Sequence, residues 1–458
     1  MSNALVPTVP VRVSAAGGGV AASGVPASSI AANGVAIETF IAEELVELKA
    51  IRRDLHSHPE LSFQERRTAG VVARELAKLG IAHKVGLGAD MGAGGSASIT
   101  DITTDRSGTG IVGYLPASTA EGNKLTAVGL RADMDALPIL EATGKEYSSV
   151  NPGVMHACGH DGHTTMLIGA ARVLSRMHRP RPVTFIFQPA EEGGGGAEVM
   201  CKQGCLEGGE VGSPQGGIGN PVGAMFGLHG WPTFDVGRVA SKAGPLLAAT
   251  DEVEITIIGT QAHGAYPHFG NDPIVAAAHV VVALQTVASR NVGPLDSVVV
   301  TVGKIEAGTA SNIIPERASM LITVRTLRAA TRALAKERVL AIVQGTAAAL
   351  GCRAEITYNQ GYPATINDSG ATEEFFAIAG SVIGVGAAER IEQATMGGED
   401  FAYYGQAVPA CFFFLGLKPA DAATCPTLHQ PDFDFNDEAI ETGVRLMCEL
   451  ATRAESGV

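Results

Sequence analysis

The chain has 458 residues and a formal net charge of −14, with 46% hydrophobic and 17% charged residues. This composition supplies apolar material for a large core and excludes a disordered chain. The acidic balance argues against a nucleic-acid partner, because binding to phosphates requires a basic surface.

Three further features bear on where the protein works. The seven cysteines are irregularly spaced and indicate no disulfide framework, which favours a cytoplasmic protein. No run of eighteen apolar residues occurs, so we expect neither a membrane span nor a membrane partner. Residues 1–36 are mainly Ala, Gly, Ser, Val and Pro, and we expect a flexible N-terminal segment rather than a secretion signal.

Strands and helices alternate from residue 37 to residue 247. This alternation predicts a mostly parallel or mixed sheet that helices cover on both faces. Segments rich in Gly, Ser and Pro at 88–110 and 204–221 predict long loops. The pattern of apolar residues predicts helices at 37–56, 67–80 and 161–178, and strands at 124–133, 181–192 and 222–230.

A second unit follows at residues 248–360. Its predicted order is β-α-β-β-α-β, a compact sheet with two helices on one face. A strand expected at 410–417 completes the first sheet, so residues 361–458 return to the first domain. The predicted fold is therefore an α/β domain, built from 37–247 and 361–458, that a smaller domain interrupts.

The densest cluster of reactive side chains is MHACGHDGHT at residues 155–164. Cys158 and His160 lie between a turn and a helix, and thiolate and imidazole are good ligands for zinc and similar ions. Open α/β sheets build their sites where strands end. The alternative, about as strong on this motif alone, is a polar helix start that Asp161 caps.

A second cluster, QPAEEGGGGA, follows an apolar strand. Adjacent residues of an extended segment point in opposite directions, so Glu191 and Glu192 are expected to play different roles. One carboxylate could bind a metal ion while its neighbour moves protons. The alternative is an ordinary acidic strand end in water.

Two histidines and two aspartates lie in comparable places. His229 ends a strand and His429 precedes the last helix, although a lone histidine of this kind is more often structural than a ligand. Asp133 and Asp135 follow a buried strand, where a carboxylate can orient a metal-bound imidazole or simply form a turn. Each residue gains weight because Cys158 and the Glu pair need further ligands.

Nine segments occur in a characteristic order. They are RRDLHSHPELSFQE, RADMDALP, MHACGHDGHT, QPAEEGGGGA, GLHG, AHGAYPH, ASNIIPERASMLITVRT, GGEDFAYY and LHQPDFDFND. Together they resemble the M20 metallopeptidase family, in particular the amidohydrolase branch of hippurate hydrolases, N-acyl-amino-acid aminoacylases and auxin-conjugate hydrolases. The resemblance, which extends from about His56 to the C-terminus, implies a zinc-peptidase-like catalytic domain and an inserted lid domain that often makes a homodimer.

The resemblance also implies roles for individual residues of the catalytic domain. Glu191 matches the general base, and Asp135 matches a carboxylate near the ligands. Cys158 marks this branch and would bridge or neighbour two ions. One or two divalent ions, zinc or manganese, would be held by Cys158, His160, Glu192, His229 and His429.

The lid contributes three residues, and the catalytic domain one more. His263 matches a histidine that reaches the substrate carbonyl, often from the partner subunit. Asn312 and Arg325 match residues that hold the carboxylate of the substrate, and Gly398 matches a backbone position that lines the site. Without the resemblance, the first three would be read as a loop histidine, a turn cap and a surface charge.

We therefore expect hydrolysis of the amide bond of an N-acyl amino acid or a related small amide that carries a carboxylate. Two alternatives stay open at this point. One is a hydrolytic deaminase or carbamoylase that acts on an aromatic amine or a carbamoyl compound. The other is a non-catalytic metal-binding protein on the same scaffold.

Overall fold

The computed structural model describes residues 27–89, 108–213 and 215–455. Most of the flexible segment expected at 1–36 and of the loop expected at 88–110 lies outside the described residues. The first helix, α1 (Ala27–Ser57), begins ten residues (37 − 27) before its expected start. Its added turns contain several alanines, which have the highest intrinsic helix propensity.

Eight strands form one mixed sheet with the order β1-β2-β4-β3-β5-β16-β6-β15. Strand β3 is parallel to both β4 and β5, and β16 is parallel to β5, so the carboxyl ends of these four strands meet at one edge. The strands of this sheet are β1 (Ala82–Leu87), β2 (Gly110–Leu115), β3 (Ala127–Asp133), β4 (Val183–Gln188), β5 (Val222–Asp235), β6 (Val239–Ser241), β15 (Ala388–Arg390) and β16 (Ala410–Lys418).

Helices cover both faces of this sheet. In β4, Phe185 and Phe187 pack in one core and Ile186 packs in the other, as the alternation of side chains along a strand requires. Helices α1, α2, α3, α7 and α9 pack on the larger core, and α4 and α8 on the smaller. The helices added here are α2 (Arg66–Lys78), α3 (His160–Ser175), α4 (Gly196–Lys202), α7 (Ser369–Ile383), α8 (Ala402–Ala407) and α9 (Ala439–Arg453).

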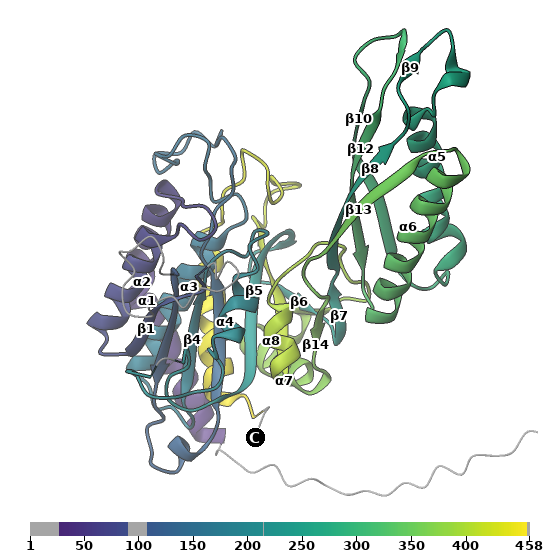
Figure 1. Cartoon of the computed structure of the whole chain (residues 1–458). Coiled ribbons are helices and arrows are strands. Elements are labelled where there is room, and N and C mark those ends of the chain that lie inside the picture. Colours follow the sequence, from purple (N-terminus) through teal and green to yellow (C-terminus); the bar gives the residue numbers. More distant parts are fainter. Residues whose placement is uncertain (1–26, 90–107, 214, 456–458) are drawn as a thin grey trace, which may run out of the picture.

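The inserted domain is a separate four-stranded antiparallel sheet with the order β10-β12-β8-β13. Two helices, α5 and α6, pack on one of its faces (Figure 1). This is the β-α-β-β-α-β arrangement expected from the sequence, and the predicted fold class is confirmed. The elements are β8 (Ala249–Ile258), α5 (Pro273–Thr286), β10 (Val298–Ala307), β12 (Arg317–Thr326), α6 (Ala329–Ala349) and β13 (Arg353–Gln360).

Two small pairs of strands lie at opposite ends of the inserted domain. Strands β9 (Ala262–His263) and β11 (Ile313–Ile314) pair at the tip that points away from the large sheet (Figure 1). Strands β7 (Gly244–Leu247) and β14 (Thr365–Asn367) pair where the chain leaves and re-enters the catalytic domain.

One described helix, Pro273–Asn291, is long and apolar enough to cross a membrane by length and composition alone. It consists of α5 and a π-helical end, and one side of it packs on the sheet of the inserted domain. A single helix of this kind is weak evidence for a membrane span. The absence of a membrane partner stays a prediction.

Candidate metal centre

The five predicted ligands come together at the carboxyl edge of the large sheet. Cys158 precedes α3 and His160 is its first residue, while Glu192 follows β4 and His229 lies in β5. His429 comes from the loop between β16 and α9, and its φ of 65° is one of the few positive values of a described non-glycine residue. Such strained backbone is typical of functional sites.

The ligand atoms form overlapping groups whose members lie within 4.8 Å of one another. One group contains Cys158, His160 and His229, and a second contains Cys158, Glu192 and His429. The sulfur of Cys158 lies 3.3 Å from His229 Nε2, and Glu192 Oε1 lies 3.2 Å from His429 Nε2. Because Cys158 belongs to both groups, two ions could share its thiolate.

Two buried atoms at this centre lack a hydrogen-bond partner among the described residues. They are Nε2 of His160 and Oε1 of Glu192. Each lies near a group of possible opposite charge, Nε2 of His160 at 3.7 Å from Asp133 Oδ2 and Oε1 of Glu192 at 3.2 Å from His429 Nε2, but neither contact has the geometry of a hydrogen bond. The other nitrogen of His160 lies 2.9 Å from the carbonyl oxygen of Asp135, which leaves Nε2 free for a cation. Buried polar atoms are normally satisfied, so these two atoms are suited to bind a metal ion. Thiolate, imidazole and carboxylate suit zinc and manganese alike.

The electrostatics of the centre also favour a cation. Burial, followed by Glu192 and Glu191, raises the pKa of the Cys158 thiol well above its usual range. Burial, followed by Glu399 and other carboxylates, raises the pKa of Glu191 in the same direction. A divalent cation would counter these negative charges and favour the thiolate over the thiol.

The segment after β4 differs from the expected extended conformation. Residues 191–194 form a turn, which begins after Ala190 at a φ of 53°. The turn directs both carboxylates toward the ligands, so that Glu191 and Glu192 lie within 4.8 Å of a ring nitrogen of His160. The prediction that these neighbours point in opposite directions was therefore wrong, because glycines allow the chain to turn at this position.

Asp135 holds this turn. Its carboxylate accepts hydrogen bonds from the backbone N–H groups of Glu191 at 3.0 Å and of Glu192 at 2.9 Å. It also lies 3.2 Å from Nδ1 of His160 and accepts a bond from the hydroxyl of Ser62 at 2.8 Å. Asp135 thus orients an imidazole and two acidic residues together.

His163 does not have a free nitrogen for a metal ion. Its Nδ1 lies 2.7 Å from Asp133 Oδ1, and its Nε2 accepts a hydrogen bond from the N–H of Gly230 at 2.8 Å. Asp161 does not cap α3, because Gly159 occupies the N-cap position and Asp161 contacts His56 at 2.8 Å instead.

A buried arginine that the sequence did not single out lies behind the centre. The guanidinium of Arg131 contacts Asp133 at 2.7 Å, Glu399 at 3.0 Å and Asp400 at 3.1 Å. Carboxylate oxygens of Glu399, Asp400 and Glu191 lie within 4.8 Å of one another. The sequence did contain a signal for Glu399 and Asp400, because they form an acidic pair in the motif GGEDF that is similar to the pair Glu191 and Glu192. Nothing in the spacing linked it to Arg131.

A pocket of about 710 Å³ opens beside the metal centre and reaches the inserted domain. Arg325 of β12 and Gly398 line it, as the resemblance implied, together with Trp231, Tyr362 and Glu252. The guanidinium lies beside Gly398, since a Cβ on that glycine would be 3.4 Å from Arg325 Nη1.

His263 and Asn312 do not line this pocket in the described chain. Both residues are exposed and belong to the tip, where His263 pairs with Ile313 across β9 and β11. Their expected contact with substrate would require a second subunit, and it stays a prediction.

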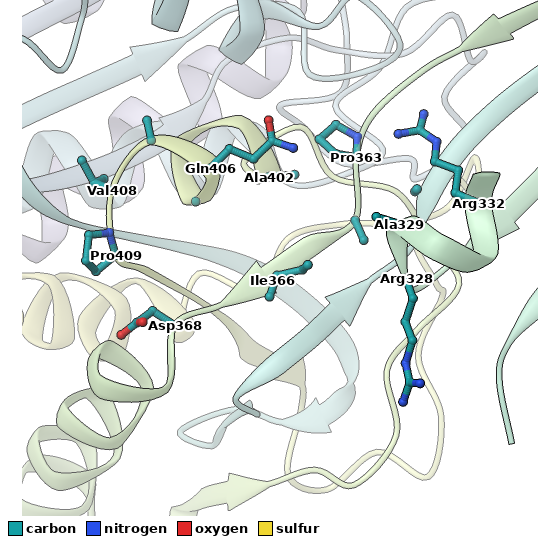
Figure 2. A pocket seen from close by; sticks show the side chains of 14 residues that line it. Arg328, Ala329, Arg332, Pro363, Ile366, Asp368, Ala402, Gln406, Val408 and Pro409 are labelled. Atoms are coloured by element: carbon teal, nitrogen blue, oxygen red, sulfur yellow. The ribbon is translucent and has the colours of Figure 1, made fainter.

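A second pocket, of about 510 Å³, lies where the inserted domain joins the catalytic domain (Figure 2). Pro363 and Ile366 line it together with residues of α8 and the start of α6. Its two arginines are already paired, Arg328 with Asp296 at 3.1 Å and Arg332 with Asp251. This pocket carries no cluster of metal-ligating side chains among the described residues.

Comparison with known proteins agrees with this geometry. Residues 129–453 match the peptidase family M20/M25/M40. The chain belongs to this family. It is 36% identical over 410 residues to the IAA-amino acid hydrolase ILR1-like 4 of Arabidopsis thaliana, and the alignment covers 88% of this chain and 84% of the relative. It is 37% identical over 397 residues to the N-acetyldiaminopimelate deacetylase of Bacillus cytotoxicus, and this alignment covers 87% of this chain and 95% of the relative.

A solved structure shares the fold. The YXEP protein of Bacillus subtilis, described as a dinuclear metal binding peptidase of the M20 family, superposes with a TM-score of 0.71 at 32% identity. The match covers 91% of this chain and all of the other. The present chain, as a member of the M20 family, is therefore a metal-dependent amidohydrolase.

Proposed function

We propose that the protein hydrolyses the amide bond of N-acyl amino acids, with Glu191 as the general base. The observation that carries this proposal is the position of Glu191. Glu191 is buried, with 6% of its surface exposed, and it lines the pocket. It lies within 4.8 Å of His160 and Glu192, but it belongs to neither of the two ligand groups that contain Cys158. One carboxylate is thus left to move protons.

Cys158, His160, Glu192, His229 and His429 would hold one or two divalent ions. A bound ion supplies Lewis-acid chemistry, which lowers the pKa of a water molecule toward about 7 and polarises the amide carbonyl. The carboxylate of Glu191 accepts the proton of the attacking water and passes it to the nitrogen of the leaving group, which departs as a neutral amine. Burial and the neighbouring carboxylates raise the pKa of Glu191, and a bound cation would counter this effect, so that Glu191 is ionised when it accepts the proton.

The wall of the pocket supports a substrate with a carboxylate. Burial lowers the pKa of Arg325, but an arginine remains charged at neutral pH and can bind a carboxylate through two parallel hydrogen bonds. The pocket volume is in the range for small molecules. Two relatives, one named as an IAA-amino acid hydrolase and the other as an N-acetyldiaminopimelate deacetylase, support the same substrate class.

We also propose a homodimer that forms through the inserted domain. The outer side of α5 exposes Ile274, Val275 and Val282, the last of which is 71% exposed. Covering these apolar side chains with a second copy would remove them from water. The molar mass in solution tests this proposal, and a monomer at micromolar concentration contradicts it.

A substrate panel tests the reaction. Protein loaded with zinc or manganese is incubated with N-acetyl and N-benzoyl amino acids, dipeptides and aminobenzoates, and the release of free amino acid and of ammonia is measured. We expect free amino acid from at least one N-acyl amino acid. Release of ammonia from an aminobenzoate, without any amino acid, would favour the deaminase instead. A metal-loaded protein that is inert across the panel would indicate a binding protein.

A further inference from the structure

The turn that carries Glu191 and Glu192 is held from two sides. Asp135 accepts from its two N–H groups, as described above. On the opposite side, the hydroxyl of Tyr362 donates a hydrogen bond to the carbonyl oxygen of Glu191 at 2.6 Å and accepts one from the N–H of Gly195 at 3.0 Å. The phenol therefore spans the whole turn, yet none of the roles assigned above uses it.

Tyr362 reaches this turn from outside the large sheet. It belongs to residues 361–364, the return linker, which joins β13 of the inserted domain to β14. Its backbone pairs with Thr250 at the start of β8: Tyr362 N donates to Thr250 Oγ1 at 3.1 Å, and Thr250 N donates to the carbonyl oxygen of Tyr362 at 3.0 Å. Tyr362 thus lies in one connection between the two domains and is hydrogen-bonded to Thr250, which directly follows the other connection at the start of β8.

The return linker has space on both of its sides. Gly361 and Tyr362 line the pocket beside the metal centre, and Pro363 and Ala364 line the second pocket (Figure 2). Gly361 ties the linker to the inserted domain, since its N–H donates to the carbonyl oxygen of Thr250 at 2.9 Å and its carbonyl oxygen accepts from Arg332 at 2.8 Å, so a movement of that domain carries the linker with it.

The hydroxyl of Tyr362 is suited to this contact at neutral pH. Burial, followed by the charges of Asp400 and Glu191, raises the pKa of Tyr362 above its usual range, so the phenol keeps its proton. A protonated phenol donates to one group and accepts from another, as both ends of the turn require.

We propose that Tyr362 is a positioning residue that couples the orientation of the inserted domain to the placement of Glu191 and Glu192. A rotation of the inserted domain moves the return linker, and the phenol transmits this movement to the carbonyl side of the turn. Asp135 keeps the amide side fixed, so the two carboxylates tilt relative to His160. The catalytic part of this inference rests on the proposed role of Glu191 as the general base.

The test compares Tyr362→Phe with Tyr403→Phe. The first variant keeps the ring and removes the hydroxyl that holds the turn. The second is a matched control, because Tyr403 lies next to Tyr362, with ring centroids 6.4 Å apart, and contacts Glu198 rather than the turn. For each full-length variant, kcat, KM, metal content, melting temperature and amide hydrogen exchange of the peptide that contains Gly195 are measured.

We expect Tyr362→Phe to lower kcat by about 10- to 100-fold, because small displacements of a catalytic group cost this much, with KM, metal content and melting temperature close to those of Tyr403→Phe. The amide of Gly195 should exchange faster in Tyr362→Phe alone, because it loses its acceptor. Equal kcat in the two variants, or a parallel loss of kcat, metal and stability, would overturn the proposal.

Hydrogen exchange needs no turnover and separates the two proposals. If the panel yields no substrate, the proposed function fails, whereas faster exchange at Gly195 in Tyr362→Phe still supports the connection between linker and turn. Unchanged exchange at Gly195 overturns that connection whatever the activity.

Discussion

The metal centre and the tip of the inserted domain differ in how completely one chain determines them. At the centre, each predicted ligand lies near the others, and Asp135 and Arg131 fix the surrounding carboxylates through buried contacts. At the tip, His263 is exposed; its Nδ1 accepts a hydrogen bond from the N–H of Ala265 at 3.0 Å, and its ring centroid lies 5.4 Å from that of Tyr266. The same sequence resemblance supported both regions, so a resemblance alone does not tell which site is complete within one subunit.

The largest loss of activity should come from a substitution at the metal centre, which one chain forms completely. Glu191→Gln removes the proposed base and should lower kcat by about 10²- to 10⁴-fold, because general base catalysis is typically worth that much. Metal content, measured by elemental analysis, should stay unchanged. Glu198→Gln on α4 is a suitable control, since Glu198 belongs to none of the ligand groups and its contacts are with Lys202 at 2.7 Å and with Tyr403. Near-normal turnover of Glu191→Gln would remove the proposed mechanism.

If His263 at the tip of the inserted domain acts in the site of a second subunit, two inactive variants should complement each other. His263→Ala should lower kcat by about 10²- to 10³-fold if His263 stabilises the oxyanion, as single donors of this kind do. When this variant is mixed with Glu191→Gln and the subunits exchange, a hybrid contains one site with both residues, and a measurable part of the activity should return. If the mixture stays inactive after exchange is demonstrated, His263 does not act across the interface, and the tip has another role.

A smaller effect is expected where the inserted domain meets the pocket. Arg325→Ala should lower kcat/KM by about 10- to 100-fold for substrates with a free carboxylate, since a hydrogen bond to a charged group is worth about 1.5–3 kcal/mol. The matched substrate with an amidated carboxylate should lose much less. Arg317→Ala on the same strand, where the arginine is exposed, is the control. Equal losses for both substrates would show that Arg325 does not read the carboxylate.

The last expected effect concerns stability and leaves activity aside. Burial opposes protonation of His56, but hydrogen bonds to Asp161 and Glu141 raise its pKa to about 9 from the usual 6.5. This contribution, roughly 3 kcal/mol at most, is fully present below pH 6.5 and is lost as the pH rises through 9. Unfolding of metal-loaded protein between these pH values should show the loss, and His56→Gln should show less of it. An equal slope in both proteins would assign the pH dependence to other groups.

Much of the fold and of the centre could be predicted from the sequence. Periodicity located most strands and helices, and the ligands lie in short motifs at strand ends, where the topology of a parallel sheet brings them together. The turn at Glu191 could not be read, because an acidic pair before glycines is compatible with a strand end as well as with a turn. Arg131 and Tyr362 were missed because Glu399, a partner of Arg131, lies 268 positions away, and Glu191, a partner of Tyr362, lies 171 positions away; no local pattern encodes such contacts.

The place of His429 in the chain has a consequence for biosynthesis. The other four ligands are all present once the first half of the polypeptide has left the ribosome, whereas the last one arrives after the inserted domain and strand β16 have been made. A nascent chain therefore contains Cys158, His160 and His229 before His429, the last proposed ligand, has been synthesised. We therefore expect the complete set of proposed ligands to form only after β16 and the loop that follows it have been synthesised.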